Sequence, residues 1–300
     1  MTAIGLTRGW VAERLPARPP RAHKGTFGRL LIVAGSPEYA GAALLTGLGA
    51  IRAGVGLACL ATPEAVGYRL MGLVPELTAM LLVEEAPGLT APAGWRQLAS
   101  EARAYAALVV GPGLGRQPAT LRRARNFIGE LGHPAVVDAD GLTALGEVDR
   151  WWQPIRAPLV LTPHAGEFAR LMRTAARESL ADDDDQREEA AREAAAVWGQ
   201  VVVLKGAHTV IASPTGDVLR SDVATPALAT AGSGDVLAGV IGAFLAAGLE
   251  PLDAAGCGVA IHGAAGLLAE DRIGHAGVVA RDIANLLPTA IEQLRDGRSG

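Results

Sequence analysis

Short apolar runs alternate with turns and helical patterns along most of the chain. Residues 42–52 place small and apolar side chains at helical spacing, and a further apolar run follows at 57–61. Runs rich in Val, Ile and Leu on both faces are typical of parallel strands that helices cover. Such runs lie at 29–34, 107–110, 135–137, 159–161 and 201–204. Because strand and helix patterns alternate continuously, we expect the α/β class, with a mostly parallel central sheet covered by helices.

A turn of polar or small residues follows directly on each of these apolar runs. The turns are Gly35-Ser36, Gly111-Pro112-Gly113, Asp138-Ala139-Asp140-Gly141, Thr162-Pro163-His164 and Lys205-Gly206. In an open parallel sheet, ligands bind at the carboxyl ends of the strands. The coincidence of these motifs with strand ends therefore favours an enzyme.

Three other stretches complete the outline of the chain. Residues 14–21, with three prolines, predict an extended arm before the first strand, and residues 87–94 predict a surface loop. The acidic run at 182–185 predicts a helix N-terminus, which the helix dipole favours, rather than a metal site. No repeat or linker divides the sequence, so we expect a single domain over residues 1–300, with 1–22 as an N-terminal arm.

Composition narrows the class of protein. With 50% hydrophobic and 19% charged residues and a mean hydropathy of +0.26, the 300-residue chain can bury a large core. A net charge of -4 and a pI near 5.9 argue against a nucleic-acid partner. The longest apolar stretch, 236–249, is shorter than a membrane span, and residues 1–16 lack a signal-peptide pattern. Two cysteines without a CxxC argue against a disulfide or zinc scaffold. We therefore expect a soluble, cytoplasmic protein with no nucleic-acid or membrane partner.

Lysine is rare in this chain, because 25 of the 27 basic residues are arginine. The two lysines, Lys24 and Lys205, each precede a glycine. An arginine-rich coding background explains most of the imbalance. Lysine is a slim chain with a compact charge, whereas arginine is a wide planar fork. We therefore expect at least Lys205 to serve a site where the backbone comes close.

Residues 229–240 carry the most specific motif, Ala-Thr-Ala-Gly-Ser-Gly-Asp-Val-Leu-Ala-Gly-Val. Small residues let backbone N–H groups converge on an anion, and the apolar helix that follows directs its positive end there. Asp235 is placed to accept the proton of a hydroxyl that attacks a phosphoryl group, although a helix cap is the alternative. The motif resembles the anion hole of the ribokinase-like kinases.

Seven motifs in order extend this resemblance from about residue 8 to residue 290. They are the block formed by 23–28, 34–36, Tyr39 and 41–45, then 50–56, 111–115, 137–142, 161–168, 205–209 and 229–239. Together they resemble the ADP-dependent (S)-NAD(P)H-hydrate dehydratase family, which has a three-layer ribokinase-like fold.

The resemblance implies a lyase that repairs nicotinamide cofactors. NADH and NADPH become inactive when water adds at C6 of the nicotinamide ring. The family uses ADP, with a divalent metal such as Mg²⁺, to return the S-hydrate to NAD(P)H, releasing AMP and phosphate. Phosphorylation turns the C6 hydroxyl into a better leaving group, so a kinase-like first step suits the anion hole.

The resemblance implies a role for each residue that stands at a functional position of the family's motifs. The residues that would hold ADP or AMP are Lys205, Gly206, Ala207, His208, Thr209 and Gly234. Those that would hold the hydrated cofactor are Ala42, Gly113, His164 and Asp235, of which Asp235 would be catalytic. Glu167, Asp138 and Asp140 could hold metal or phosphate, but cap and turn roles are equally open, so no metal ligand is assigned. Cys59, Cys257 and His262 are expected in the core.

Two segments depart from the family pattern. Residues 231–235 read Ala-Gly-Ser-Gly-Asp where the family often has Gly-Gly-Thr-Gly-Asp, and residues 221–226 lack its usual Asn and Gly. The second departure leaves base or ribose recognition by that loop open. The length leaves no room for the epimerase domain of bifunctional relatives, so we expect a separate NAD(P)HX epimerase to act alongside. Alanine- and glycine-rich helices, expected to be exposed, and the family's common assembly favour a homotetramer.

Two other classes of function compete with this interpretation. An ATP-dependent kinase of the same fold, acting on a vitamin-precursor alcohol, would share the anion hole and Asp235. It does not account for the His-Lys-Gly segment at 23–25 or the Thr-Pro-His-Ala-Gly-Glu segment at 162–167. A nucleotide-binding sensor is less favoured, because a pure binder needs no proton acceptor beside the phosphate. The sequence alone leaves open ADP or ATP, and NADH hydrate or NADPH hydrate.

Overall fold

A mixed sheet of ten strands runs through the centre of the computed structural model, which describes residues 3–173 and 183–296. The strands are β1 (Ile4–Gly5), β2 (Arg29–Val33), β3 (Leu57–Pro63), β4 (Thr78–Leu82), β5 (Glu84–Ala86), β6 (Leu89–Thr90), β7 (Ala107–Val110), β8 (Ala135–Val137), β9 (Leu159–Leu161), β10 (Val201–Leu204), β11 (Val210–Ala212) and β12 (Val218–Arg220). Their order in the sheet is β1-β12-β11-β10-β9-β8-β7-β2-β3-β4, while β5 and β6 pair separately. Only β11 runs antiparallel to its neighbours in the large sheet. The expectation of a mostly parallel sheet is confirmed.

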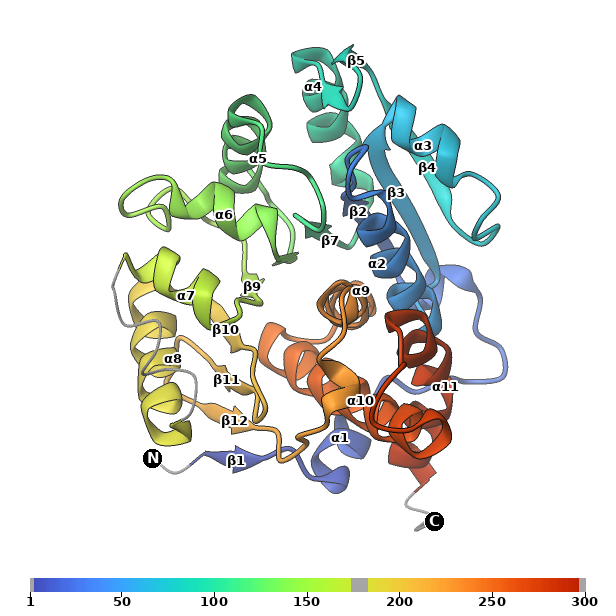
Figure 1. Ribbon diagram of the computed structural model, residues 1–300, viewed down its shortest axis with the longest axis vertical. Coiled ribbons are helices and arrows are strands. Elements are labelled where there is room, and N and C mark those ends of the chain that lie inside the picture. Colours follow the sequence, from blue (N-terminus) through green and yellow to red (C-terminus); the bar gives the residue numbers. More distant parts are fainter. Residues whose placement is uncertain (1–2, 174–182, 297–300) are drawn as a thin grey trace.

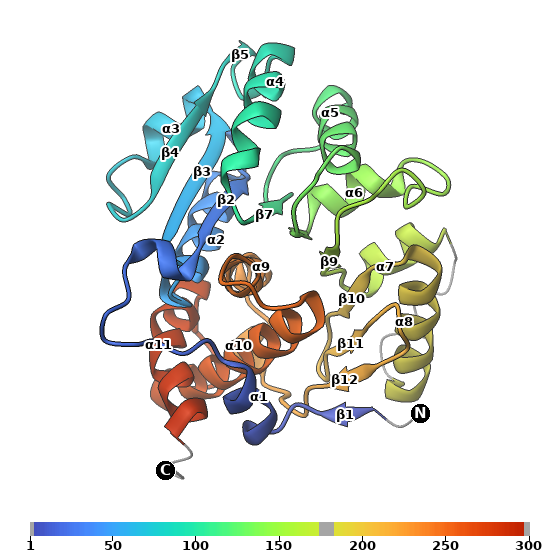
Figure 2. The same cartoon turned by 180° about the vertical axis from the view of Figure 1, so that it is seen from behind.

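Helices cover both faces of this sheet and make three layers (Figures 1 and 2). The helices are α1 (Arg8–Arg14), α2 (Ala40–Arg52), α3 (Glu64–Leu70), α4 (Pro92–Glu101), α5 (Pro118–Gly129), α6 (Asp140–Gly146), α7 (Ala165–Met172), α8 (Asp184–Trp198), α9 (Ser233–Ala246), α10 (Pro251–Ile273) and α11 (Ala280–Asp296), with short 3₁₀ turns η1 (Lys24–Phe27), η2 (Ala102–Ala104) and η3 (Pro226–Leu228). Helices α2, α9, α10 and α11 pack on one face, and α4 to α8 on the other.

Alternate residues of each strand feed two separate cores. Leu30 and Ile32 of β2 belong to the core beneath α9, whereas Leu31 and Val33 belong to the core beneath α4 to α8. This division follows from the two-residue period of a strand. It explains why the strands read as unbroken apolar runs, since neither face of the sheet meets water.

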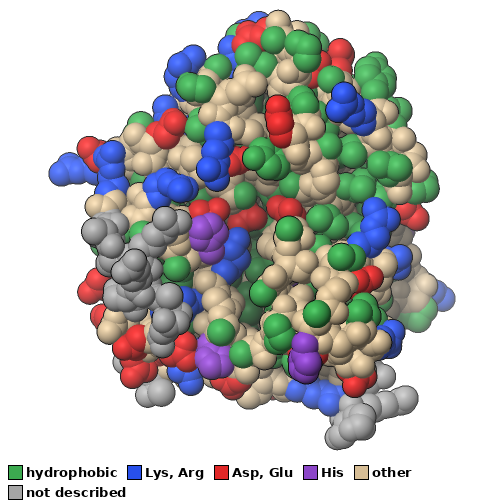
Figure 3. Space-filling model, viewed as in Figure 1, with side chains coloured by type: hydrophobic (Ala, Val, Ile, Leu, Met, Phe, Trp, Pro, Cys, Tyr) green, Lys and Arg blue, Asp and Glu red, His purple; other side chains and the backbone are tan. Residues whose placement is uncertain are grey.

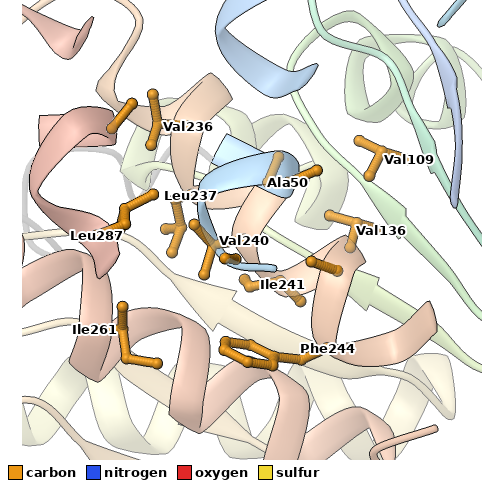
Figure 4. Packing of buried hydrophobic residues seen from close by; sticks show 14 of the residues in the cluster. Ala50, Val109, Val136, Val236, Leu237, Val240, Ile241, Phe244, Ile261 and Leu287 are labelled. Carbon is orange, nitrogen blue, oxygen red and sulfur yellow. The ribbon is translucent and has the colours of Figure 1, made fainter. Parts of the chain in front are cut away.

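Helix α9 lies at the centre of the first core and packs closely against α2 (Figure 4). A Cβ atom on Gly239 would lie 2.0 Å from the carbonyl oxygen of Thr46, and one on Gly49 would lie 2.4 Å from that of Val236. Only glycine permits so close an approach of the two backbones. The glycines of α2 and α9 therefore set the depth at which α9 sits, and with it the position of its first turn.

Two expectations for the flanking segments need revision, and a third is confirmed. Residues 1–22 are more than an arm, because β1 pairs with β12 at the sheet edge and α1 follows it; only the part after α1 is irregular. The segment 87–94 contains β6 and the start of α4, so it is not simply a loop. The acidic run does begin a helix, since Asp183 caps α8 by accepting from the Asp185 and Gln186 amides; Asp182 lies outside the described residues.

The alanine- and glycine-rich helices are buried, so the expectation that they are exposed is wrong. Residues 236–246 of α9 are all buried within the fold. Helix α10 is long and apolar enough to cross a membrane, yet 72% of its most apolar window is buried inside the protein. Their composition serves close helix packing, and the argument from exposed small-residue helices to a homotetramer no longer holds.

Candidate active site

The first turn of α9 forms an anion-binding nest at the carboxyl ends of the strands. Gly232 precedes the helix with φ of 87°, a conformation that favours glycine, and a Cβ there would lie 2.4 Å from Leu45. The first N–H groups of a helix have no acceptor within the helix, and the dipole adds positive potential at that end. This turn can therefore bind a phosphate through backbone groups alone.

A cavity of about 710 Å³ opens beside this nest. It is lined by His164, Lys205, Gly206, Ala207, Thr209, Val223, Ala224, Thr225, Pro226, Leu228, Ala229, Thr230, Ser233, Gly234, Leu237 and His262. Figure 3 shows acidic, basic and histidine side chains gathered around a hollow near the middle of this face. The wall from η3 is apolar, whereas the wall from β10 and α9 is polar, an arrangement that suits a ligand with one flat apolar end and one charged end.

Lys205 projects from the end of β10 into the cavity and is held by a buried carboxylate. Its Nζ lies 2.8 Å from Oδ1 of Asp138, which also accepts a 2.7 Å hydrogen bond from Oγ1 of Thr162. Asp138 is 1% exposed, so this is a buried ion pair. Burial disfavours the charged ammonium, but nearby carboxylates, Asp138 first, outweigh it and raise the pKa of Lys205. The ammonium is therefore charged at every physiological pH.

The same ammonium lies against the nest. A Cβ on Gly234 would stand 3.3 Å from Nζ of Lys205, so the side chain ends beside the first turn of α9. An anion bound at that turn would meet the helix N–H groups and the lysine charge together. The slim lysine side chain fits between the Asp138 carboxylate and Gly234, which has no side chain to obstruct the ammonium.

Asp235 follows Gly234 in the first turn of α9 and is mostly buried. Burial, and after it the negative charge of Asp138, raises the pKa of Asp235 to about 7, although Lys205 opposes the rise. The N-terminal cap position of α9 is Gly232, and no side chain caps that end. Asp235 is therefore not the helix cap, and its carboxylate can exchange a proton near neutral pH.

His164 caps the N-terminus of α7 and also borders the cavity. Its Nδ1 accepts hydrogen bonds from the amides of Gly166 (3.0 Å) and Glu167 (3.3 Å), while Glu167 accepts one from the His164 amide (3.0 Å). Burial lowers the pKa of His164, although Glu167 opposes this effect. With Nδ1 occupied as an acceptor, the neutral ring carries its proton on Nε2. That nitrogen lies 3.5 Å from Oε1 of Glu167, and its N–H is the group that His164 can offer to a ligand in the cavity.

Ala42, in the first turn of α2, and Gly113, in the turn after β7, lie together outside the cavity lining. A Cβ on Gly113 would lie 2.9 Å from Cβ of Ala42 and 2.7 Å from Tyr39, which is 55% exposed. Nearby, Ser36 is buried, and its hydroxyl has no hydrogen-bond partner among the described residues. An exposed aromatic ring and an unpaired hydroxyl at a strand end suit a ring-bearing ligand.

A family model described as NAD(P)H-hydrate dehydratase matches residues 30–289 of the chain. The chain belongs to the NAD(P)H-hydrate dehydratase family. An ADP-dependent (S)-NAD(P)H-hydrate dehydratase of Xanthomonas campestris is 36% identical over 95% of this chain and 95% of its own length. The bifunctional NAD(P)H-hydrate repair enzyme Nnr of Moorella thermoacetica is 40% identical over 97% of this chain, which spans 54% of that relative. The chain thus spans about half the length of the bifunctional relatives that it matches.

Solved structures agree with this family membership. The ADP/ATP-dependent NAD(P)H-hydrate dehydratase from Bacillus subtilis, co-crystallised with ATP and Mg²⁺, superposes with a TM-score of 0.84 at 33% identity and covers 98% of this chain and 99% of its own. A ribokinase-like superfamily protein from Enterococcus faecalis, at 22% identity and a TM-score of 0.76, shares the fold. The expected three-layer ribokinase-like fold is confirmed.

Within this family fold, most residues predicted to hold nucleotide line one cavity. Lys205, Gly206, Ala207, Thr209 and Gly234 all border it. His208 does not line it; its Nδ1 lies 2.7 Å from Oδ2 of Asp184 on α8. His164, predicted to hold the hydrated cofactor, lines this same cavity.

The structure adds residues that the sequence interpretation did not select. Ser233 and His262 meet at the cavity wall, and Thr162 helps to hold Asp138. The segment 223–230 supplies the apolar wall, where the sequence showed only a departure from the family pattern. The position of Ser233 in the motif, two residues before Asp235, was a usable signal, whereas nothing in the sequence places α10 against α9.

Lys24, the other rare lysine, lies far from this site. It is exposed in η1, before the amino end of β2, whereas Lys205 follows the carboxyl end of β10. A Cβ on the nearby Gly28 would lie 1.8 Å from the carbonyl oxygen of Ala246. The segment 23–28, which begins with His-Lys-Gly, thus packs closely on the end of α9, at the opposite end of the sheet from the candidate site.

The carboxylates considered for metal binding already have protein partners. Asp138 bonds Lys205 and Thr162, and Asp140 accepts from the Gly115 amide at 2.9 Å and from Arg116 at 3.2 Å. Across residues 3–173 and 183–296, no group of three or more His, Cys, Asp or Glu side chains is arranged to hold a metal ion. These residues therefore do not fit a magnesium ion held by protein side chains alone.

Proposed function

We propose that the protein catalyses the ADP-dependent dehydration of the S-epimer of hydrated NADH and NADPH, a lyase reaction. The observation that carries the proposal is the electrostatic interaction of Asp235, in the first turn of α9, with the Lys205 ammonium, which lies beside that turn and lines a cavity of about 710 Å³. A proton acceptor, a fixed cation and an anion nest are the groups that phosphoryl transfer to a hydroxyl requires. The activities named for its family relatives support the same reaction.

The first step transfers a phosphoryl group to the hydrated cofactor. The C6 hydroxyl oxygen attacks the β-phosphorus of ADP, the bond to AMP breaks, and the hydroxyl proton passes to the carboxylate of Asp235. Lys205 and the first N–H groups of α9 stabilise the charge on the phosphoryl oxygens. Because the pKa of Asp235 is about 7, the carboxylate is a competent acceptor at neutral pH.

The second step eliminates phosphate from the phosphorylated intermediate. The lone pair of the ring nitrogen expels phosphate as the C6–O bond breaks, and loss of a proton from C5 completes the C5=C6 double bond. The balance is NAD(P)H hydrate plus ADP giving NAD(P)H, AMP and phosphate. Hydroxide is a poor leaving group, so the transfer in the first step makes this elimination feasible.

An absorbance assay tests the proposal. The protein is incubated with hydrated NADH or hydrated NADPH and either ADP or ATP, and the recovery of reduced-nicotinamide absorbance is followed. We expect recovery with ADP together with stoichiometric AMP and phosphate. No recovery with either nucleotide, combined with phosphorylation of a thiazole or pyrimidine alcohol by ATP, would favour the vitamin-precursor kinase instead.

Further properties of the protein remain predictions. Mg²⁺ in such sites is usually held by nucleotide phosphates with one or two carboxylates, where it neutralises phosphate charge, and a relative was co-crystallised with ATP and Mg²⁺. We predict that Mg²⁺ arrives with the nucleotide. A homotetramer, a cytoplasmic location and action alongside an NAD(P)HX epimerase stay predictions from the sequence and from its resemblance to the family.

A further inference from the structure

A buried histidine of α10 contacts the serine that opens α9. Nε2 of His262 lies 3.1 Å from Oγ of Ser233. The two residues are 6% and 4% exposed, yet both line the cavity assigned to the nucleotide. His262 is thus in the core, as expected, but its ring nitrogen reaches a polar group at the anion nest. The reaction proposed above gives this pair no role.

The protonation state of His262 limits what this contact can do. Burial lowers the pKa of His262 to about 4, and the charge of Lys205 adds to the effect, although a hydrogen bond with the Ser233 backbone opposes it. At neutral pH the ring is therefore neutral, with one N–H donor and one bare nitrogen acceptor. The Ser233 hydroxyl has one proton, so the contact has two forms. Either the hydroxyl donates to Nε2, or Nε2–H donates to the hydroxyl oxygen.

A phosphate at the nest distinguishes the two forms. Phosphate oxygens are acceptors, and if the hydroxyl proton points to Nε2 the serine turns only lone pairs toward the anion. If Nε2 carries the proton, the hydroxyl accepts from His262 and its own proton is free for the phosphate. The next residue, Gly234, lies against the Lys205 ammonium, so Ser233 borders the point where the positive groups converge. Only the second form adds a donor to that point.

We propose that His262 is a positioning residue whose Nε2–H donates to Ser233 Oγ and directs the serine hydroxyl proton to a phosphate of the bound nucleoside diphosphate. The proposal rests on the proposed function for the identity of the ligand. It predicts that His262 acts on nucleotide binding only through Ser233. The Ser233 hydroxyl is the donor and His262 only fixes its orientation, so a change at His262 should have no effect once that hydroxyl has been removed.

A double-mutant cycle tests this dependence. The variants are His262→Leu, Ser233→Ala and the double variant, with His262→Gln as the conservative change because its amide N–H reaches a position similar to Nε2. Ile261→Val is the matched control, since Ile261 is the neighbouring, fully buried residue and belongs to the hydrophobic core (Figure 4). The Kd of ADP is measured by calorimetry, KM and kcat by absorbance, and thermal unfolding reports on packing.

We expect Ser233→Ala to weaken ADP binding by about tenfold to a hundredfold, the usual worth of a hydrogen bond to a charged group. His262→Leu should weaken it measurably but by no more than Ser233→Ala, because the hydroxyl keeps its proton and loses only its fixed orientation. The double variant should lose no more than the worse single variant, His262→Gln should recover most of the affinity, and Ile261→Val should bind ADP normally. Losses that multiply in the double variant would overturn the proposal. So would normal ADP binding by a His262→Leu protein that unfolds earlier, because His262 would then serve packing alone.

A measurement on the unmodified protein covers the case in which His262→Leu does not fold. Nitrogen-15 NMR of the histidine side chains in the ADP complex identifies the ring nitrogen that carries the proton. We expect Nε2–H at His262, and an Nδ1–H tautomer would refute the proposal. Calorimetry and NMR both report on the ADP complex without turnover. Wild-type protein that binds ADP but restores no NADH would count against the proposed dehydratase, and the test of His262 would still stand.

Discussion

Replacing Asp235 by Asn should make the protein more stable and nearly inactive. The asparagine keeps the shape of the side chain but has no carboxylate to accept a proton. A positioned general base contributes about 10²- to 10⁴-fold, so turnover of hydrated NADH should fall by at least about a hundredfold. Because α9 begins with Gly232 as its cap and no side chain caps it, the substitution removes no capping hydrogen bond.

The gain in stability follows from the cost of ionising a buried carboxyl group. The pKa of Asp235 rises from 3.8 to about 7 on folding. Since one pKa unit corresponds to about 1.4 kcal/mol, ionised Asp235 lowers the free energy of unfolding by about 4 kcal/mol. Below pH 4 the group is protonated in both states and the cost is absent. As the pH rises from 4 to 7, the unfolded chain loses the proton first, so the cost grows and is complete above pH 7.

Urea unfolding of the wild type and of Asp235→Asn, at pH 4 and pH 8, measures this difference. The two proteins should unfold at similar urea concentrations at pH 4, and the variant should be more stable at pH 8 by up to about 4 kcal/mol. Asp222→Asn is the control, because the side chain of Asp222 is 81% exposed and its loss should change little. A variant that is less stable at pH 8, or equally stabilised at both pH values, would refute the reasoning. Near-normal turnover would rule out Asp235 as the proton acceptor.

The wild-type kcat/KM for hydrated NADH should rise about tenfold per pH unit below 7 and level off above it, because Asp235 must be ionised; a flat profile from pH 5 to 8 would contradict this. Lys205→Arg should cost about tenfold or more in ADP affinity or turnover, since a wide guanidinium does not fit against the nest, and unchanged ADP titration would exclude the role. Gly113→Val should raise KM for the hydrated cofactor far more than KM for ADP, since its Cβ would press on the N-terminus of α2; equal effects would mean that the two sites are wrongly divided. Gly239→Ala should lower stability by about 1–3 kcal/mol in thermal unfolding, because its Cβ meets a carbonyl oxygen of α2, whereas Gly132→Ala, which has open space, should not.

The local pattern of the chain was enough to predict the class of fold. Apolar runs without polar alternation require cover on both faces, and the alternation with helices then leads to a parallel sheet. The same pattern failed at the N-terminus, because β1 has only two residues and its partner, β12, is more than two hundred positions away. So short a strand has no periodicity to detect, and its pairing at the sheet edge depends on contacts made by the folded chain.

The sequence was similarly informative about local parts of the site. A run of small residues before an apolar helix specifies an anion nest within one turn, and the rarity of lysine drew attention to Lys205. Composition misled where small residues serve close packing, since Gly49 of α2 and Gly239 of α9 are buried where the two helices meet. Composition alone cannot distinguish an exposed helix that is rich in small residues from a buried one whose small residues let another helix pack closely against it.

By itself the sequence determined which functional groups stand at each strand end, because the residues of a motif and the turn they form depend only on neighbours along the chain. Only the tertiary structure decided which of these groups meet. It brought Asp138, from the end of β8, to 2.8 Å from Lys205 at the end of β10, and it placed His262 of α10 against Ser233. It also buried Asp235, which raises the pKa of that carboxyl group to about 7. Distances between segments remote in sequence, and the low dielectric that strengthens charge interactions, arise only when the sheet and its helices pack.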